Sequence, residues 1–524
     1  MSTKDRSAKA KTKKHSKVST KNKIIITVVI VLLALLCFAY IANETGLPAK
    51  VLPGAKIVHT VDGKEKTVKR ISIVEMNYYY ALTYNQYAQY GLIKDEATLD
   101  EVYNPANGQT YRDMLWENAA NSAQTQYLLY EAADKAGFKP VAAERYAESQ
   151  VDAVRESCDY MNTLRGSNMT ADQYLQNMYG KGMTVQIYRK IMKRAAVVDE
   201  YRTSLQQSTF VPNQADLQAK FDEDPEKYTY AHFQLYFIQA DIPENATDEQ
   251  KQKALDEALK KAEAISDGCV NAVEFQTRVM QVCTDDYRDR FAKGETPTAK
   301  SGYNKEQIAS ISPEFADFCF DPNTEANSGM TFIDKESIGA YAALFEDTYV
   351  DDTPVCSYRV LKLDDDLLKD ISKTLEQKAP SHQKLHAQAA EYMASVTTEE
   401  QFAELAKKYS VDSGTFLIGG YVSGVKESDF KGTVLEEGGE PQLAPEDQQL
   451  KDWLMDPARK KGDMLIIDCV ASVNLYYYCD SVPLWMDTIR ADMTSENYNA
   501  WYTGTVSDTS YSTVVNHGLI DFFT

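Results

Sequence analysis

The chain has 524 residues, of which 44% are hydrophobic and 25% are charged. These ordinary globular values exclude a wholly disordered chain, a collagen and a polytopic membrane protein, and the length predicts roughly three or four domains. The formal net charge is −21, from 56 Lys and Arg against 77 Asp and Glu. So acidic a balance argues against a nucleic-acid partner, because binding phosphates requires basic surface.

The N-terminus predicts a membrane anchor. The first 23 residues carry nine basic side chains and one acidic one, and residues 24–42 form an uncharged apolar run of nineteen residues. As a helix this run would span about 28 Å, close to a bilayer core. Cleavage after Ala42 would place Tyr40 where signal peptidase favours a small residue. We therefore predict a cytoplasmic tail (1–23) and an uncleaved transmembrane signal anchor (24–43) in the cell membrane, with the bulk of the chain extracytoplasmic.

The next region, 44–225, predicts a helical lobe after a short hairpin. Asp62 and Gly63 form a typical turn pair between β-prone flanks. Helical spacing then dominates, with a break at Gly180 and Gly182 and a capped helix starting at Asn213. Tyrosine is abundant, with 34 residues in the chain. The tyrosines of this region either pack a core or offer exposed area to extended apolar peptides.

Beyond residue 228 strands and helices alternate, which predicts an α+β fold. Phe275 and Asp285 stand ten residues apart, as do Phe402 and Asp412, and this echo indicates two related units, 226–365 and 366–484, before a C-terminal helix and tail, 485–524. The expected strands are 230–240, 354–363, 464–471 and 473–479, and the expected helices are 247–267, one from Ala272, 365–396, 399–409 and 485–502.

A family resemblance rests on the second unit. Residues 402–415 read FAELAKKYSVDSGT, and GGYVSG follows from Gly419. This closely resembles the signature of parvulin-type prolyl isomerases, an F-x-x-L-A-x-x-Y/F-S helix before a G-G-x-L-G turn. Residues 313–320, PEFADFCF, resemble the family's later P-E-F-x-x-A-A-F helix, and 358–363 looks like its closing strand. The helical region is similar to the N-terminal chaperone lobe of SurA/PrsA-type foldases.

The resemblance implies a helical chaperone lobe and two divergent parvulin-like units, each with helices on a small, mostly antiparallel sheet. Rotation about the bond before a proline faces a barrier of about 20 kcal/mol. An isomerase lowers this barrier with an apolar pocket for the proline ring and with polar groups that favour the twisted amide. The residues implied in catalysis are His232, Asp285 and Asp412. Those implied in the walls of the substrate pocket are Ile311, Phe315 and Phe320.

The sequence departs from the family pattern at two positions. Arg359 replaces the histidine of the expected closing strand in the first unit, and Tyr476 stands near the corresponding place in the second. His232 on a strand is also compatible with a structural role, and the two aspartates with turn or cap carboxylates.

No metal or other cofactor is expected. His382 and His386 are four residues apart but lack an acidic third ligand at helical spacing. The seven cysteines beyond the anchor show no CxxC and predict reduced, mostly buried thiols, with isolated Cys269–Cys283 or Cys469–Cys479 disulfides left open.

Two functions follow as expectations. The first is a membrane-anchored prolyl isomerase acting on newly exported proteins. The alternative is a non-catalytic holdase that uses degenerate parvulin units to bind peptides. Both predict unfolded or newly exported polypeptides as partners and the membrane as a contact through residues 24–43, and neither involves nucleic acid. The oligomeric state is not indicated.

Overall fold

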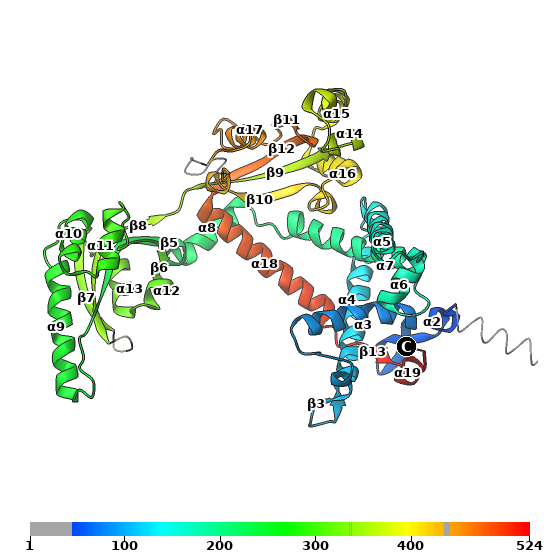
Figure 1. The fold of residues 1–524 in the computed structure, drawn as a ribbon, viewed down its shortest axis with the longest axis horizontal. Coiled ribbons are helices and arrows are strands. Elements are labelled where there is room, and N and C mark those ends of the chain that lie inside the picture. Colours follow the sequence, from blue (N-terminus) through cyan, green and yellow to red (C-terminus); the bar gives the residue numbers. More distant parts are fainter. Residues whose placement is uncertain (1–44, 335, 337, 434–440, 524) are drawn as a thin grey trace, which may run out of the picture. The chain divides into compact units, whose positions relative to one another are not determined.

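The computed structural model describes residues 45–334, 336, 338–433 and 441–523 (Figure 1). Contacts divide them into two bodies. The terminal body comprises the described residues up to Tyr201 and those from Trp501 onward, and the central body comprises Arg202–Ala500. Helices accompany small antiparallel sheets throughout, so the α+β class predicted from the sequence is confirmed.

The terminal body combines helices with a three-stranded sheet in the order β13-β1-β2. The predicted hairpin turn is present, with positive φ angles of 51° at Asp62 and 72° at Gly63, as a two-residue turn of this hand requires. The elements are α2 (Leu47–Val51), β1 (Pro53–Val61), β2 (Lys64–Ser72), α3 (Ile73–Gln89), η1 (Ala97–Asp100), β3 (Val102–Asn104), β4 (Gln109–Thr110), α4 (Tyr111–Lys135), α5 (Ala143–Arg165), α6 (Ala171–Tyr179), α7 (Val185–Ser204), β13 (Tyr511–Val515) and α19 (His517–Phe523).

The C-terminal segment completes this body. β13 pairs antiparallel with β1, with Ala55 opposite Val515. The sequence analysis expects only a tail after the C-terminal helix, whereas the structure has a strand here that pairs with residues more than 400 positions away. The core lies where α3 meets α4 and the sheet, and it includes Ile57, Met76 and Trp116.

The central body contains two four-stranded antiparallel sheets (Figure 1). The first central sheet has the order β6-β5-β8-β7. One of its faces packs on α9 and α10 and the other on α12 and α13. The elements up to its last strand are η2 (Leu205–Thr209), α8 (Gln214–Glu223), η3 (Pro225–Tyr228), β5 (Thr229–Gln239), α9 (Asp248–Ser266), α10 (Ala272–Val282), α11 (Asp285–Ala292), β6 (Ala299–Asn304), α12 (Lys305–Ala309), α13 (Pro313–Phe320), β7 (Ser328–Asp334) and β8 (Gly339–Val350).

The second central sheet has the order β10-β9-β12-β11. Helices α15 and α16 pack on one face and α17 on the other. Its elements and the helix that follows are β9 (Pro354–Leu363), α14 (Asp366–Lys369), α15 (Leu375–Ser395), α16 (Glu399–Tyr409), η4 (Phe416–Ile418), β10 (Tyr421–Val425), η5 (Glu427–Asp429), α17 (Pro445–Leu454), β11 (Met464–Cys469), β12 (Ser472–Pro483) and α18 (Leu484–Val506).

The two central sheets repeat one pattern. With the four strands of each sheet counted in chain order, the first strand lies in the sheet between the second and the fourth. Along the chain, helices precede the second strand, and a shorter helical segment precedes the third. A register shift also recurs in each last strand, where Glu346 and Cys479 are the extra residues. This shared bulge aligns His232 with Ser357, which lie opposite Asp347 and Asp480 respectively.

One strand belongs to a different sheet from the one predicted. Residues 358–363 lie in β9, the first strand of the second central sheet, and β8 closes the first. The reading of Arg359 as a closing-strand substitution is therefore wrong, because Arg359 pairs with Tyr477 and Tyr421 inside the second sheet. The sheets divide between Val350 and Pro354, before the boundary predicted at 365.

The predicted anchor at 24–43 lies outside the described residues. Among the helices that the structure does describe, none combines the length and the apolar character needed to cross a bilayer.

Candidate functional site

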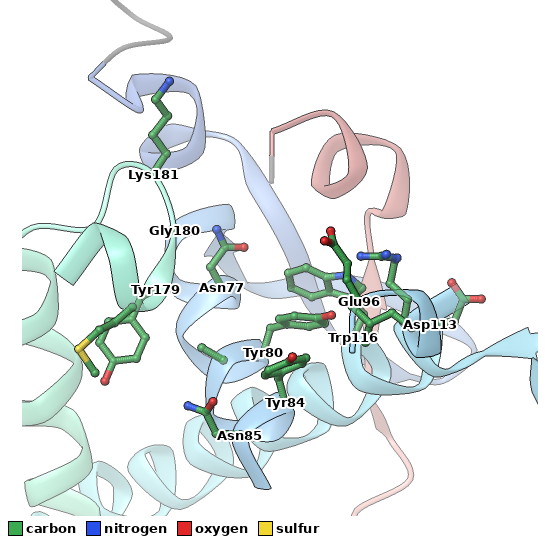
Figure 2. Close-up of a pocket in the computed structure, with 14 residues that line it drawn as sticks. Asn77, Tyr80, Tyr84, Asn85, Glu96, Asp113, Trp116, Tyr179, Gly180 and Lys181 are labelled. Carbon is green, nitrogen blue, oxygen red and sulfur yellow. The ribbon is translucent and has the colours of Figure 1, made fainter. Parts of the chain in front are cut away.

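A cleft of about 930 Å³ opens on the terminal body (Figure 2). One wall is a stripe along α3 formed by Asn77, Tyr80, Ala81, Tyr84 and Asn85. Their spacing of three, four, seven and eight residues from Asn77 places them on one face of the helix. The volume is at the upper end of the range for ligand sites in proteins.

Local sequence fixes where this helix begins and which side it buries. The Ser72 hydroxyl accepts a hydrogen bond from the backbone N–H of Glu75 at 3.3 Å, an N-cap that satisfies one of the first free amides. Ile73, Val74 and Met76 then lie in the core. Because the start of α3 and its buried side are fixed in this way, the residues of the stripe face the cleft.

Aromatic rings form the centre of the cleft. Tyr80 stacks on Trp116 of α4, with ring centroids 4.2 Å apart and planes 27° apart. Tyr84 lies 6.4 Å from Tyr80 in a similar orientation. Burial raises the pKa of Tyr80, which keeps its phenol neutral at physiological pH. The rings therefore supply uncharged, amphipathic contact area.

Two charged side chains of the cleft already have partners within the terminal body. Arg112 lies 3.0 Å from Asp100. Asp113 accepts a hydrogen bond from the backbone N–H of Thr110 at 3.2 Å, as part of a capping box at the start of α4. The other two charged residues of the lining are Glu96 and Lys181, so the cleft offers aromatic and amide contacts together with charges of both signs.

The first central sheet places His232 at an accessible position. Its Nδ1 lies 2.7 Å from Oδ1 of Asp347, and its ring stacks on Tyr349 at 4.2 Å. The side chain of His232 is 41% exposed. Asp347 orients the imidazole from the last strand, a partnership that the sequence did not reveal because the two residues are 115 positions apart.

Asp285 does not join His232. It begins α11 with a 94% exposed side chain and forms an ion pair with Arg288 at 2.8 Å. The preceding residue, Thr284, lies against Tyr236. Tyr236 is four residues beyond His232 on β5, a separation of about 13 Å along a strand. The structure therefore does not assemble these two predicted catalytic residues.

The predicted pocket walls pack the core of the same sheet. Phe315 is fully buried and contacts Phe233 edge to face at 5.2 Å. Ile311 and Phe320 are half-buried and pack against the same cluster. Phe315 offers no surface to a substrate, because its ring is used entirely in packing α13 onto the sheet.

Asp412 holds the loop after α16. Its Oδ1 accepts a hydrogen bond from the backbone N–H of Gly414 at 3.4 Å, and its Oδ2 accepts one from the Thr415 hydroxyl. These are turn contacts, the alternative role considered from the sequence. Tyr476, on the last strand, is buried and packs edge to face on Tyr358.

Arg359 occupies the interior of the second central sheet. Its Nε donates to Glu399 at 3.0 Å, and its Nη1 donates to the carbonyl oxygens of Ile418 and Gly419 at 3.2 and 3.0 Å. The guanidinium carbon lies 4.9 Å from the ring centroid of Tyr421. Arg359 thereby ties β9 to α16 and to the glycine turn that precedes β10.

The remaining histidines and cysteines that the structure describes form no cluster of ligands. His382 lies 2.8 Å from the carbonyl oxygen of Cys469, and His386 lies 3.0 Å from Asp468. Within the described part of the chain, no group of three His, Cys, Asp or Glu side chains is placed to hold a metal ion. The seven cysteines described are free thiols, buried except for the half-buried Cys469.

No protein-family model matches the chain, and no curated protein sequence matches it significantly.

Proposed function

We propose that the chain is a membrane-anchored, extracytoplasmic holdase that binds unfolded polypeptides in the cleft of the terminal body. The observation that carries this proposal is the combination of stacked aromatic rings and side-chain amides along that cleft. Unfolded chains expose apolar side chains together with unpaired peptide groups, and such a lining offers partners to both.

The second central sheet supports a distant relation to SurA/PrsA-type foldases. This support comes from Phe402, which lies in a helix packed on a small antiparallel sheet, and from the Gly419-Gly420 turn, which leads into β10. The proposal treats both central sheets as degenerate parvulin-like units. It favours the non-catalytic reading because Asp285 lies apart from His232 and Ser357 takes the histidine position in the second sheet.

The proposed location rests on the sequence alone. A basic segment precedes the apolar run at 24–43, and the chain has a net charge of −21. Newly exported proteins, still unfolded, are the clients that such a location would supply. An acidic surface would keep the protein soluble and would favour basic clients.

The holdase function can be tested with the purified full chain and reduced, alkylated lysozyme, which cannot refold. The chain should suppress aggregation of this client, measured by light scattering. Ala81→Arg should abolish the suppression, because it places a long side chain in the cleft while keeping a good helix former. Gln86→Arg, at an exposed position of α3 outside the cleft lining, should not change it. Equal suppression by all three proteins would refute the role of the cleft.

Prolyl isomerisation at the first central sheet is a second candidate. It is favoured by one observation, the accessible His232 held between Asp347 and Tyr349. A protease-coupled assay on a proline peptide decides the matter. Activity that disappears in His232→Ala and persists in Gln86→Arg would establish an isomerase, whereas equal rates with and without the chain would leave the holdase.

A further inference from the structure

The side-chain oxygen of Asn77 has no hydrogen-bond partner among the residues that the structure describes. Asn77 is 8% exposed, and its Oδ1 is buried without a hydrogen bond. A buried acceptor left unpaired is costly, and folded proteins satisfy almost all such groups. Asn77 lines the cleft, so a small rotation of its side chain would present this oxygen to a molecule bound there.

The surroundings of Asn77 hold its amide at the wall of the cleft. Figure 2 shows the side chain between Gly180 and the aromatic residues Tyr80 and Trp116. Gly180 has a φ of +86°, and a Cβ added to it would lie 2.8 Å from Nδ2 of Asn77. The backbone at Gly180 therefore approaches the amide as closely as only glycine allows. A larger residue at 180 would displace the amide from this position.

The chemistry of this amide indicates what it recognises. A carboxamide carries one acceptor oxygen and two donor hydrogens, which complement the N–H and C=O of a peptide group. Arg112 and Asp113 already have partners, so they are less available to a ligand than the Asn77 amide. Asn85 lies two helical turns further along the same stripe, about 12 Å from Asn77 along the helix axis. That distance corresponds to about four residues of extended chain.

We propose that Asn77 pairs with one peptide group of an extended polypeptide segment lying along α3. The cleft then favours a backbone N–H at that position of the bound segment and disfavours proline, which has none. This inference rests on the proposed function, and it specifies which feature of the polypeptide the cleft recognises. Binding is tolerant of side-chain sequence but sensitive to methylation of one backbone nitrogen.

The test uses short fluorescein-labelled peptides that tile the lysozyme sequence, with binding to the full chain measured by fluorescence anisotropy. The tightest binder is resynthesised with each backbone nitrogen methylated in turn. Methylation at one position should weaken binding to the wild type about two- to tenfold, the loss expected for one hydrogen bond. The same methylation should have no effect on binding to Asn77→Leu.

Matched variants separate recognition from folding. Gln86→Leu removes an amide from the opposite face of the same helix and should retain the sensitivity to methylation. Asn77→Leu should unfold at a temperature no lower than the wild type, because it removes an unpaired buried acceptor. If leucine does not fit this site, Asn77→Ala, which favours the helix, serves in the same assay.

Each outcome of these binding measurements supports or overturns the inference. Sensitivity to methylation that persists in the Asn77 variants, or that is absent at every position, overturns this inference. If peptide binding is nevertheless lost in Ala81→Arg, the proposed function stands without it. If no peptide binds to the wild type, both the proposed function and the inference fail.

Discussion

Replacing Arg359 by leucine should loosen the second central sheet. The Arg359 side chain is 7% exposed and donates to the Glu399 carboxylate and to the carbonyl oxygens of Ile418 and Gly419. Breaking a buried ion pair costs about 3–5 kcal/mol. The lower end applies here, because Lys461 remains 2.7 Å from Glu399 and can carry part of the interaction. We expect a loss of about 3 kcal/mol.

The loss should depend on pH in a defined direction. Burial by itself would raise the pKa of Glu399, but the hydrogen bond from Lys461 and the charge of Arg359 outweigh it and lower the pKa below 4.5. A carboxylate with a lowered pKa in the folded state adds stability above its unfolded pKa, and this stability is lost as the pH falls through the folded value. The difference between wild type and Arg359→Leu should therefore shrink on acidification below about pH 4.

Hydrogen exchange followed by mass spectrometry measures this local stability in the full chain, through peptides that cover β9, α16 and β10. Arg288→Leu, followed through peptides that cover α11, is the control, since it removes an exposed ion pair with Asp285 and should cost at most about 0.5 kcal/mol. A change below about 1 kcal/mol for Arg359→Leu at neutral pH, or a difference that grows in acid, would refute this reasoning.

Three further predictions concern packing. Gly180→Ala should destabilise the terminal body by about 1–2 kcal/mol, because alanine is strained at a φ of +86° and its Cβ would clash with Asn77; an unchanged melting temperature would contradict this. Phe402→Ala should cost about 3–5 kcal/mol in denaturant unfolding, since the ring is fully buried, and a loss under about 1 kcal/mol would show that this face of α16 is not core. Burial raises the pKa of Cys319 to about 12, so iodoacetamide at pH 8 should label it only in the unfolded chain, and rapid labelling of the native protein would place it at the surface.

Local patterns in the sequence predicted the elements that depend on near neighbours. The Asp62-Gly63 turn and the cap at Asn213 are set by a few adjacent residues, and both occur as expected. The break between α6 and α7 lies at Gly180 and Gly182, which have positive φ angles. Helices α9 and α16 match the predicted ranges closely, because their apolar stripes follow the helical period.

Strand partners were not predictable in the same way. β9 was recognised as a strand but assigned to the wrong sheet, because alternation shows that a segment is extended and not which strand it pairs with. β8 and β13 were missed, and β13 finds its partner at the other end of the chain.

The candidate site was only partly visible in the sequence. Tyr80 and Tyr84 belong to the tyrosine-rich region 44–225, for whose tyrosines the sequence leaves core packing and peptide binding as the two roles. The importance of Asn77 could not be inferred, since it depends on the three-dimensional surroundings of its side-chain oxygen, which finds no partner among the described residues. His232 was predicted on its strand, but its orienting partner Asp347 was not.

The most direct test of the central claim is photo-crosslinking from the cleft. Benzoylphenylalanine at position 84 keeps an aromatic ring beside Tyr80, and the same residue at position 86 projects from outside the cleft lining. With reduced, alkylated lysozyme and the full chain, the account predicts strong crosslinks from position 84, few from position 86, and competition by unlabelled client. Equal crosslinking from both positions, or none from position 84, would contradict it.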